Sequence, residues 1–244
     1  MNQDLIAPFI EAVDGVLGSI RERELPAIRE AGDWMADAIA GGGLVHVFGS
    51  GHSELIAREI VGRAGGLVPI NEIVDPTHGR AERVEGYAAE LLNGYSLQYG
   101  LRAGEVLVVI SNSGVNPLPI EAALFARARG LRVVAITNRA QSEASSSRHG
   151  SGQRLFEVAD LSIDTHVPFG DAIVLVPGFE ARAGAGSTLA GAMIVNLLAL
   201  TTVEGLLERG VEPPLLVSQN LPGTDERNQA LFARYRGRLR QLGA

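Results

Sequence analysis

The 244-residue chain contains no cysteine. This absence excludes a disulfide framework, a thiolate nucleophile and a cysteine-based zinc site. An excess of positive charge is missing too, because 21 Lys and Arg residues stand against 28 Asp and Glu residues, for a net charge of −7. An acidic chain is a poor binder of phosphate backbones through bulk electrostatics. We therefore expect no nucleic-acid partner, and any anionic ligand must be held by local groups.

Long apolar runs are also absent. The nearest candidate, residues 189–200, falls short of the roughly 20 apolar residues that a membrane span needs. Residues 1–20 carry acidic side chains among their apolar ones, unlike the basic-then-apolar order of a signal peptide. We therefore expect a cytoplasmic protein with no membrane partner.

The chain does contain alternating strand and helix patterns. Residues 44–48, 106–110 and 131–136 are short apolar runs typical of buried parallel strands, and a helical stretch ended by Gly130 lies between the last two. This alternation predicts a doubly wound parallel sheet. Three weaker runs are candidates for the remaining strands: residues 67–70, 161–163 and 173–176.

Helical periodicity marks both ends of the chain. Residues 4–39 predict two helices, which we interpret as an N-terminal helical hairpin. Residues 187–207 predict a long, largely buried helix, and residues 225–242 a charged amphipathic one. No repeat or convincing linker interrupts the chain, so its length and its 46% hydrophobic content fit one domain with helical additions.

The first polar loop follows the first predicted strand and is rich in glycine and serine. Gly49 and Gly51 allow backbone to approach a ligand, while Ser50, His52 and Ser53 bring hydrogen-bonding groups to the start of the next helix, where free N–H groups favour anions. The alternative is a tight turn with a serine cap. Nucleotide binding is disfavoured, because a glutamate stands where the dinucleotide fingerprint needs its third glycine and no GK[ST] sequence is present.

A second polar loop, SNSGVNP, follows the next strong strand. Ser111, Asn112, Ser113 and Asn116 supply hydroxyl and amide groups, and Gly114 permits the turn. Because ligands of open α/β sheets sit at the carboxyl ends of strands, two such loops predict one ligand that carries both phosphate and hydroxyl groups.

Two further loops are less specific. Ser187 and Thr188 open the long helix within a run of small residues, which could equally serve close packing of that helix on the sheet. Residues 139–153 follow the third strand and are most simply a solvated serine loop.

These segments resemble a SIS (sugar isomerase) domain, the phosphosugar-binding module of sedoheptulose-7-phosphate isomerase, N-acetylmuramic acid 6-phosphate etherase and the glucokinase regulatory protein. The segments that carry the resemblance are VFGSGHSELIAREIVGR (47–63), VLVVISNSGVNPLPIEAALFARARGLRVVAITN (106–138) and GSTLAGAMIVNLLAL (186–200). More specifically, three segments are similar to the UPF0309 group of SIS proteins, a likeness that runs nearly end to end: SRHGSGQRLFEVADLSID (147–164), PFGDAIV (168–174) and ERGVEPPLLVSQNLPGTDERN (208–228).

The resemblance implies an α/β fold, a three-layer α-β-α sandwich around a five-stranded parallel, flavodoxin-like sheet. It implies one SIS domain over residues 1–244, with a core at about 40–205, a helical N-terminal extension at 3–40 and a C-terminal extension at 206–244. It also implies a homodimer or higher homo-oligomer and a sugar phosphate as ligand. The phosphate contacts carried over from the family fall on six residues: Ser50, Ser53, Ser111, Asn112, Ser113 and Asn116. Ser187 and Thr188, also expected to bind the substrate, open the helix that closes the pocket.

Carboxylates and histidines are the candidates for catalysis, since isomerising a phosphosugar requires a base beside the carbonyl carbon. Glu59 lies before a VGR stretch similar to that of the heptose isomerases, where a glutamate acts as base. Etherase relatives carry a VEG glutamate, for which Glu85 matches better than the nearby Glu82. For both Glu59 and Glu85 the alternative is an ordinary charged surface residue.

Among the histidines, His52 lies in the first loop, and the UPF0309 resemblance draws attention to Arg148 and His149, a cation and an imidazole that could close over an anion. No HExxH pair or other metal-ligand spacing is present, so we expect no metal and no cofactor.

The leading functional hypothesis is a sugar-phosphate or amino-sugar-phosphate isomerase with a glutamate as general base. Two alternatives stay open, a non-catalytic phosphosugar sensor that regulates a partner protein, and an etherase-like lyase. A DNA-binding regulator is disfavoured, because the chain is acidic and contains no recognisable helix-turn-helix extension.

Overall fold

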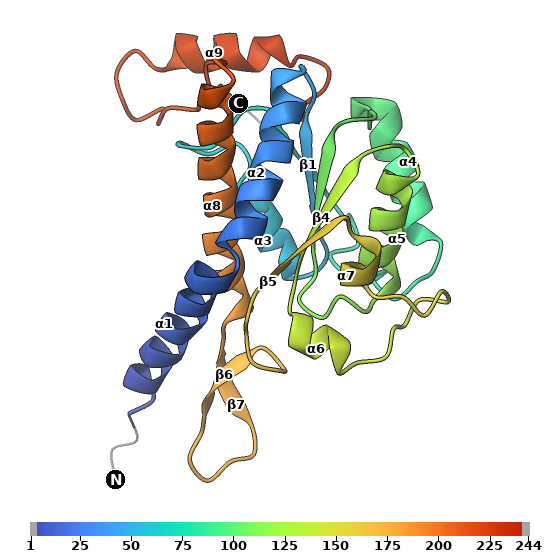
Figure 1. Cartoon of the computed structure of the whole chain (residues 1–244), viewed down its shortest axis with the longest axis vertical. Coiled ribbons are helices and arrows are strands. Elements are labelled where there is room, and N and C mark those ends of the chain that lie inside the picture. The colour runs from blue at the N-terminus through green and yellow to red at the C-terminus, as the bar shows by residue number, and fades with distance from the viewer. Residues whose placement is uncertain (1–3, 241–244) are drawn as a thin grey trace.

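The computed structural model describes residues 4–240 and is built around a five-stranded parallel sheet with the order β2-β1-β3-β4-β5. Helices cover both faces, so the predicted three-layer sandwich is confirmed (Figure 1). The strands are β1 (Val45–Gly49), β2 (Ile70–Ile73), β3 (Val106–Ile110), β4 (Arg132–Thr137) and β5 (Leu161–Asp164). Helices α2 (Leu25–Ala40), α3 (Ser53–Glu59) and α8 (Ser187–Glu208) pack on one face, and α4 (Tyr87–Tyr99), α5 (Pro117–Arg127) and α7 (Leu155–Val158) on the other.

The three strong apolar runs form the three central strands, because strands buried on both faces need apolar side chains at every position. The strand expected at 67–70 lies three residues later, at β2. Leu67 instead makes an isolated antiparallel bridge to Leu215 of the C-terminal extension. Segment 161–163 is confirmed as the edge strand β5.

The run at 173–176 is not part of the main sheet, so its assignment to that sheet was wrong. It forms β6 (Ala172–Leu175), which pairs antiparallel with β7 (Arg182–Ala185) in a separate hairpin. Phe9 of α1 (Ile6–Arg23) packs against this hairpin so closely that a Cβ at Gly184 would lie 2.7 Å from its ring.

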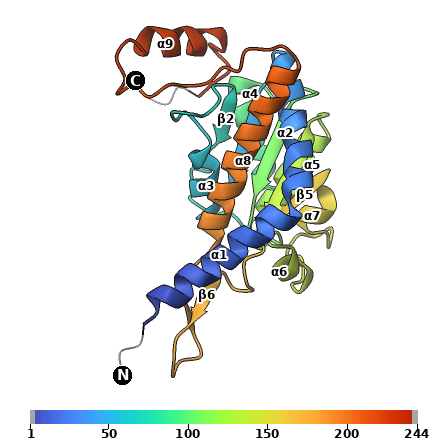
Figure 2. The same cartoon turned by 60° about the vertical axis from the view of Figure 1, so that its left-hand side comes forward.

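The N-terminal helices exist but do not form the expected hairpin. Only Glu24 separates α1 from α2, and helical hydrogen bonds continue through it, from its N–H to Ile20 and from Ile28 N–H to its carbonyl, each 2.9 Å. Because a reversal needs a loop of about 2–5 residues, α1 runs on into α2 end to end (Figures 1 and 2). Helix α1 therefore projects from the sandwich beside the β6–β7 hairpin.

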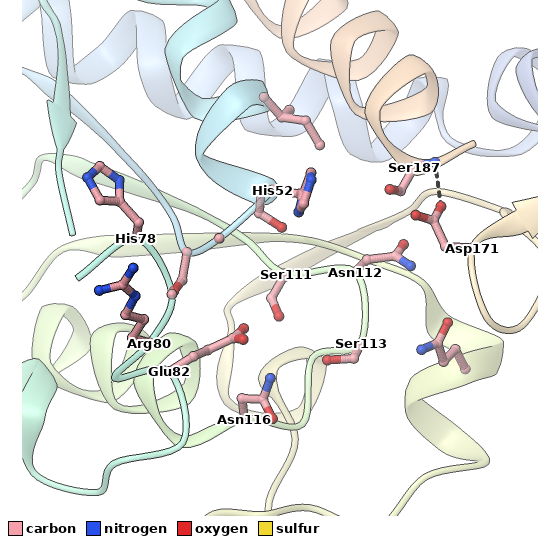
Figure 3. Close-up of a pocket in the computed structure, with 16 residues that line it drawn as sticks. His52, His78, Arg80, Glu82, Ser111, Asn112, Ser113, Asn116, Asp171 and Ser187 are labelled. Carbon is pink, nitrogen blue, oxygen red and sulfur yellow. Dashed lines mark hydrogen bonds between the residues drawn. The ribbon is translucent and has the colours of Figure 1, made fainter. Parts of the chain in front are cut away.

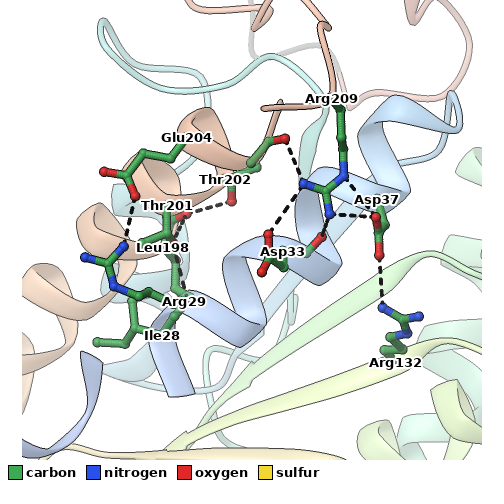
Figure 4. A network of polar contacts seen from close by, with 11 residues as sticks. Ile28, Arg29, Asp33, Asp37, Arg132, Leu198, Thr201, Thr202, Glu204 and Arg209 are labelled. Atoms are coloured by element: carbon green, nitrogen blue, oxygen red, sulfur yellow. Dashed lines mark hydrogen bonds and ion pairs between the residues drawn. The ribbon is translucent and has the colours of Figure 1, made fainter. Parts of the chain in front are cut away.

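Helix α8 is held tightly against α2. A Cβ at Gly32 would lie only 2.2 Å from Thr201 Oγ1, so the absence of a side chain there allows the two backbones to approach. Ion pairs flank this contact, including Arg209 with Asp33 and Asp37 (Figure 4). Within residues 4–240, α8 is the one helix long and apolar enough to cross a membrane by length and composition, and half of the window tested is buried inside the protein, as in a core helix.

The C-terminal extension packs at the amino ends of the strands. Its helix α9 covers Asp225–Arg234, shorter than the predicted 225–242, whose last two residues lie outside the described ones. Beyond it, Arg238 makes two contacts to the buried carboxylate of Glu105, at 2.8 and 3.2 Å, and His46 Nε2 lies 3.0 Å from the same group. Burial opposes ionisation of Glu105, but these hydrogen bonds outweigh it and lower its pKa to about 2.

Candidate functional site

A cavity of about 460 Å³ lies where the loops after β1, β2 and β3 meet, at the carboxyl ends of the strands. It is lined by residues of six segments, at 50–56, 78–82, 111–116, 141, 171 and 187, which are separated in the sequence (Figure 3). The lining residues are Ser50, Gly51, His52, Ser53, Ile56, His78, Gly79, Arg80, Glu82, Ser111, Asn112, Ser113, Asn116, Gln141, Asp171 and Ser187.

The loop after β1 is folded tightly onto the start of α3. A Cβ at Gly49 would lie 2.3 Å from the carbonyl oxygen of Ser53, so only glycine fits there. The N–H groups of residues 53–55 donate to the carbonyls of residues 50–52, at 3.1 to 3.2 Å. The first N–H groups of α3 are therefore already used within the loop.

Asp75, just after β2, is the polar centre of this side of the cavity. Its buried carboxylate accepts hydrogen bonds from Ser50 Oγ at 3.2 Å, Thr77 Oγ1 at 2.7 Å, Gly79 N at 2.9 Å and Tyr87 OH at 3.1 Å. Burial acts to raise the pKa of Asp75, but the hydrogen bonds from Thr77, Gly79 and Tyr87 outweigh it and hold that pKa below its usual value. Asp75 is therefore ionised at neutral pH.

Asp75 was not among the residues that we singled out from the sequence. The available signal was the Asp75-Pro76-Thr77 sequence, since an aspartate two residues before a turn donor commonly accepts from the backbone at that position. Its bonds to Ser50 and Tyr87 connect segments that are far apart in the chain, and no local pattern indicates those.

The segment after Asp75 packs directly against the loop after β1. Gly79 has φ +84°, and a Cβ there would lie 2.9 Å from Gly51 Cα. His78, with φ +51°, precedes it, and left-handed backbone at a non-glycine residue is a strained conformation that clusters at functional sites. This segment brings His78, Arg80 and Glu82 to the cavity, and Glu82 points toward Ser111 and Asn116 (Figure 3).

The loop after β3 contributes Ser111, Asn112, Ser113 and Asn116 to the cavity, as the sequence predicts. Gly114 has φ +62° and permits the turn between them.

Neighbouring segments hold the side chains of this second loop in place. Thr165 Oγ1 donates to Asn112 Oδ1 at 3.3 Å, and Arg148 donates to Asn116 Oδ1 at 2.6 Å. Arg148 is therefore brought next to the second loop although it does not line the cavity itself.

At the start of α8, Ser187 lines the cavity, whereas Thr188 does not. Asp171, before the β6–β7 hairpin, turns its carboxylate to this helix end and accepts from Ser187 N at 2.8 Å and Gly186 N at 3.2 Å. Asp171 is the second non-glycine cavity residue with left-handed backbone, at φ +70°. It carries negative charge in the place where an anionic ligand would otherwise meet the helix.

Only some of the predicted catalytic residues lie at the cavity. His52 lines the cavity, but Glu59 lies outside it, paired with Arg63 and 3.4 Å from Asn196 Nδ2. Glu85 also lies outside, where its Oε1 accepts from Gly150 N at 2.5 Å.

His149 is not a lining residue either, since its Nδ1 lies 2.7 Å from Ser151 Oγ and its Nε2 3.8 Å from Glu121. Glu82, the weaker of the two sequence matches, is the glutamate that lines the cavity. Among the described residues, Gly79 and Leu118 bond to its backbone, and none donates a hydrogen bond to its carboxylate. Within residues 4–240, no group of three or more His, Asp or Glu side chains could hold a metal ion.

Comparisons with known proteins agree with this architecture. The family model of the SIS domain matches residues 8–138. A UPF0309 protein of Streptomyces griseus is 38% identical over 246 aligned positions, which cover 96% of each chain.

Among solved structures, a phosphoheptose isomerase from Francisella tularensis has a TM-score of 0.58 at 18% identity, covering 82% of this chain and 96% of that one. The Vibrio vulnificus NanR protein complexed with ManNAc-6P has a TM-score of 0.52 at 16% identity, covering 86% and 68%. At these identities the two structures show a shared fold and nothing more.

Proposed function

The chain belongs to the SIS-domain family and within it to the UPF0309 group, and from this premise we propose that it binds a sugar phosphate and isomerises it, with Glu82 as the general base. The observation that carries the proposal is the cavity itself. It combines hydroxyl and amide groups suited to phosphate and sugar with one glutamate whose carboxylate accepts no hydrogen bond from residues 4–240. Sequence reasoning favoured Glu59 or Glu85 as the base, and both remain alternatives that the experiment below distinguishes.

The proposed reaction moves two protons and needs no cofactor. Glu82 takes a proton from the carbon next to the carbonyl, which leaves an enediolate, and returns it to the former carbonyl carbon. The hydroxyl proton passes to the former carbonyl oxygen, so an aldose becomes a ketose with no net loss of atoms. His52 and His78 line the same cavity and are candidates for opening the sugar ring.

The test is a panel of hexose, heptose and amino-sugar phosphates, each incubated with the protein in D₂O. We expect deuterium to enter at the carbon next to the carbonyl, and we expect Glu82→Gln to slow this exchange at least 100-fold while Kd stays within a few-fold. Glu59→Gln and Glu85→Gln serve as matched variants. If Glu59→Gln or Glu85→Gln abolishes the exchange while Glu82→Gln remains active, the substituted glutamate is the base instead. Release of a second product molecule from the substrate would indicate the etherase-like lyase.

Binding without turnover is the second candidate, favoured by a specific observation. The two glutamates that match the family's catalytic positions are both occupied, Glu59 by Arg63 and Glu85 by Gly150 N. Tight binding with no proton exchange for any sugar phosphate would support a sensor, and a partner protein whose affinity changes with the sugar phosphate would establish it.

We further propose a homodimer. Ile6 and Ile10 on the projecting helix α1 are 72% and 55% exposed, and α8 presents Leu189, Leu200 and Leu207 at its surface. By the 3.6-residue period, each set lies along one side of its helix, and such exposed apolar stripes favour an interaction surface. Sedimentation at micromolar concentration should give twice the mass of the chain, and a monomer would contradict the proposal.

The single-domain boundaries, the cytoplasmic location and the absence of nucleic-acid, membrane and metal partners stay predictions.

A further inference from the structure

Four helices begin at the cavity, and the start of each is already occupied. In the short α6 (Arg139–Glu143), the N–H groups of Arg139 and Gln141 donate to the side chains of Asp164 and Asn138. In α3 the first N–H groups donate to the carbonyls of its own loop. In α5, Pro117 and Pro119 have no N–H, and Leu118 N donates to the carbonyl of Glu82 at 3.1 Å. In α8 the carboxylate of Asp171 takes the first N–H groups. An anion in this cavity therefore depends on side chains and loop backbone rather than on the usual helix N-terminus.

The loop after β3 offers hydrogen-bond donors. Ser111 Oγ already accepts from Gly114 N at 3.3 Å, and the side-chain oxygens of Asn112 and Asn116 accept from Thr165 and Arg148. With their oxygens engaged, these three side chains keep an O–H or an NH₂ group for a ligand. The phosphate group of a sugar phosphate accepts hydrogen bonds and, as a monoester dianion, donates none, so this loop matches it.

Ser50, in the loop after β1, is left with an acceptor for the ligand rather than a donor. Its only proton points to Asp75, because an ionised carboxylate accepts hydrogen bonds and cannot donate them. What Ser50 Oγ can then offer the cavity is a lone pair. The dianion of a phosphate monoester cannot use it, because it has no P–OH to donate. The sequence and the family resemblance both place Ser50 among the phosphate contacts, and its hydrogen bond to Asp75 indicates a different role.

We propose that Ser50, positioned by Asp75, accepts a hydrogen bond from a hydroxyl or N–H of the sugar, while the loop after β3 holds the phosphate. The two loops thus fix which end of the ligand lies where. The Ser50–Asp75 pair selects ligands that carry a donor at that end, as sugars and amino sugars do. This inference rests on the proposed sugar-phosphate function and concerns the orientation of the ligand in the same cavity.

Calorimetric titration at about pH 8, where a phosphate monoester is a dianion with no proton to donate, tests it with two probes. The probes are methyl phosphate and the tightest-binding sugar phosphate of the panel. Ser50→Ala should leave the Kd for methyl phosphate within about twofold and weaken the sugar phosphate about three- to tenfold, the usual range for one neutral hydrogen bond. The matched variant Ser113→Ala, in the loop after β3, should weaken both probes. Equal losses for both probes in Ser50→Ala would overturn the proposal.

Asp75→Asn provides a second measurement, in which the affinities for the two probes should change in opposite directions. The amide can donate to Ser50 Oγ, which releases the serine proton toward the cavity and turns Ser50 into a donor. We expect tighter binding of methyl phosphate together with weaker binding of the sugar phosphate, and weaker binding of both would count against the inference. If this variant does not fold, Ser50→Ala decides alone.

Titration of the wild-type protein with both probes distinguishes failure of the proposed function from failure of the role given to Ser50. Binding of neither probe would refute the proposed function itself. Binding of methyl phosphate with no sugar phosphate bound more tightly would refute only the role of Ser50.

Discussion

Residues 50–52 and 111–116 hold equivalent positions, each after a buried central strand and before a helix, and both contain serine and glycine. Their surroundings differ. The first loop rests on an ionised carboxylate, Asp75, which takes up the proton of Ser50. The second rests on donors, Thr165 and Arg148, which take up its amide oxygens.

This difference indicates that the hydrogen-bond partners behind a polar loop decide whether its side chains donate to a ligand or accept from it. A serine offers a proton or a lone pair depending on its second partner, and an asparagine does the same through its two ends. Loops of similar composition can therefore bind opposite ends of one ligand. The predictions below test this difference, beginning with the backbone that supports each loop.

The largest effect is expected from alanine at the left-handed glycine of each loop. At Gly114 a Cβ would lie 2.7 Å from Thr137 Oγ1 and 3.0 Å from Ser142 Oγ, in addition to the backbone strain at φ +62°. At Gly51, with φ +57°, nothing lies within 4 Å. Gly114→Ala should therefore cost about 3 kcal/mol of unfolding free energy and most of the phosphate affinity, whereas Gly51→Ala should cost about 1 kcal/mol.

Urea unfolding of the two variants at one pH gives this difference directly, since both substitutions add the same methyl group. Equal destabilisation would mean that the loop after β3 yields as easily as the loop after β1. In that case the close packing around Gly114 would not matter for the site.

The next effect concerns the charge of Asp75 and its dependence on pH. The folded pKa of Asp75 is lowered, so its contribution to stability is present above the unfolded value of 3.8 and is lost as pH falls through the lower folded value. Asp75→Asn cannot titrate at that position. The difference in unfolding free energy between wild type and Asp75→Asn should therefore be constant near neutral pH and shrink below about pH 4.

Urea unfolding from pH 7 to pH 3 measures that difference, and Ser50→Ala is the control because it leaves the carboxyl group in place. A difference that stays constant down to pH 3 would mean that Asp75 is not stabilised as the anion. The assignment of the serine proton would then lose its support, and with it the contrast between the loops.

Much of the fold was predictable from the sequence because buried parallel strands require unbroken apolar runs, as β1, β3 and β4 have. Strand β2 was displaced because it contains Asn71 and Glu72, two buried polar residues whose contacts come from other elements. The β6 segment has the same apolar appearance as a sheet strand. Its pairing with β7 depends on tertiary contacts such as that of Phe9 with Gly184.

The site was predictable to a similar extent and for a similar reason. Both polar loops follow strong strands, and the rule that ligands bind at the carboxyl ends of strands brings them together. Asp75 and Asp171 were not predicted as site residues, because their roles arise from hydrogen bonds to segments that are distant in the chain. The polarity of Ser50 could not be predicted for the same reason.

The smallest effect is expected from Arg148, which supports the loop after β3 from outside the cavity. Its bond to Asn116 Oδ1 keeps the amide NH₂ of that residue turned toward the ligand. Arg148→Ala should weaken inorganic phosphate about three- to tenfold, because Asn116 is then free to turn its oxygen toward the anion. Arg129→Ala, which removes the same charge from an exposed helix end beside Phe125, is the control and should change the Kd less than twofold. Similar losses in both variants would show that Arg148 acts through its charge alone, and the idea that partners behind a loop set its polarity would then hold only for the loop after β1.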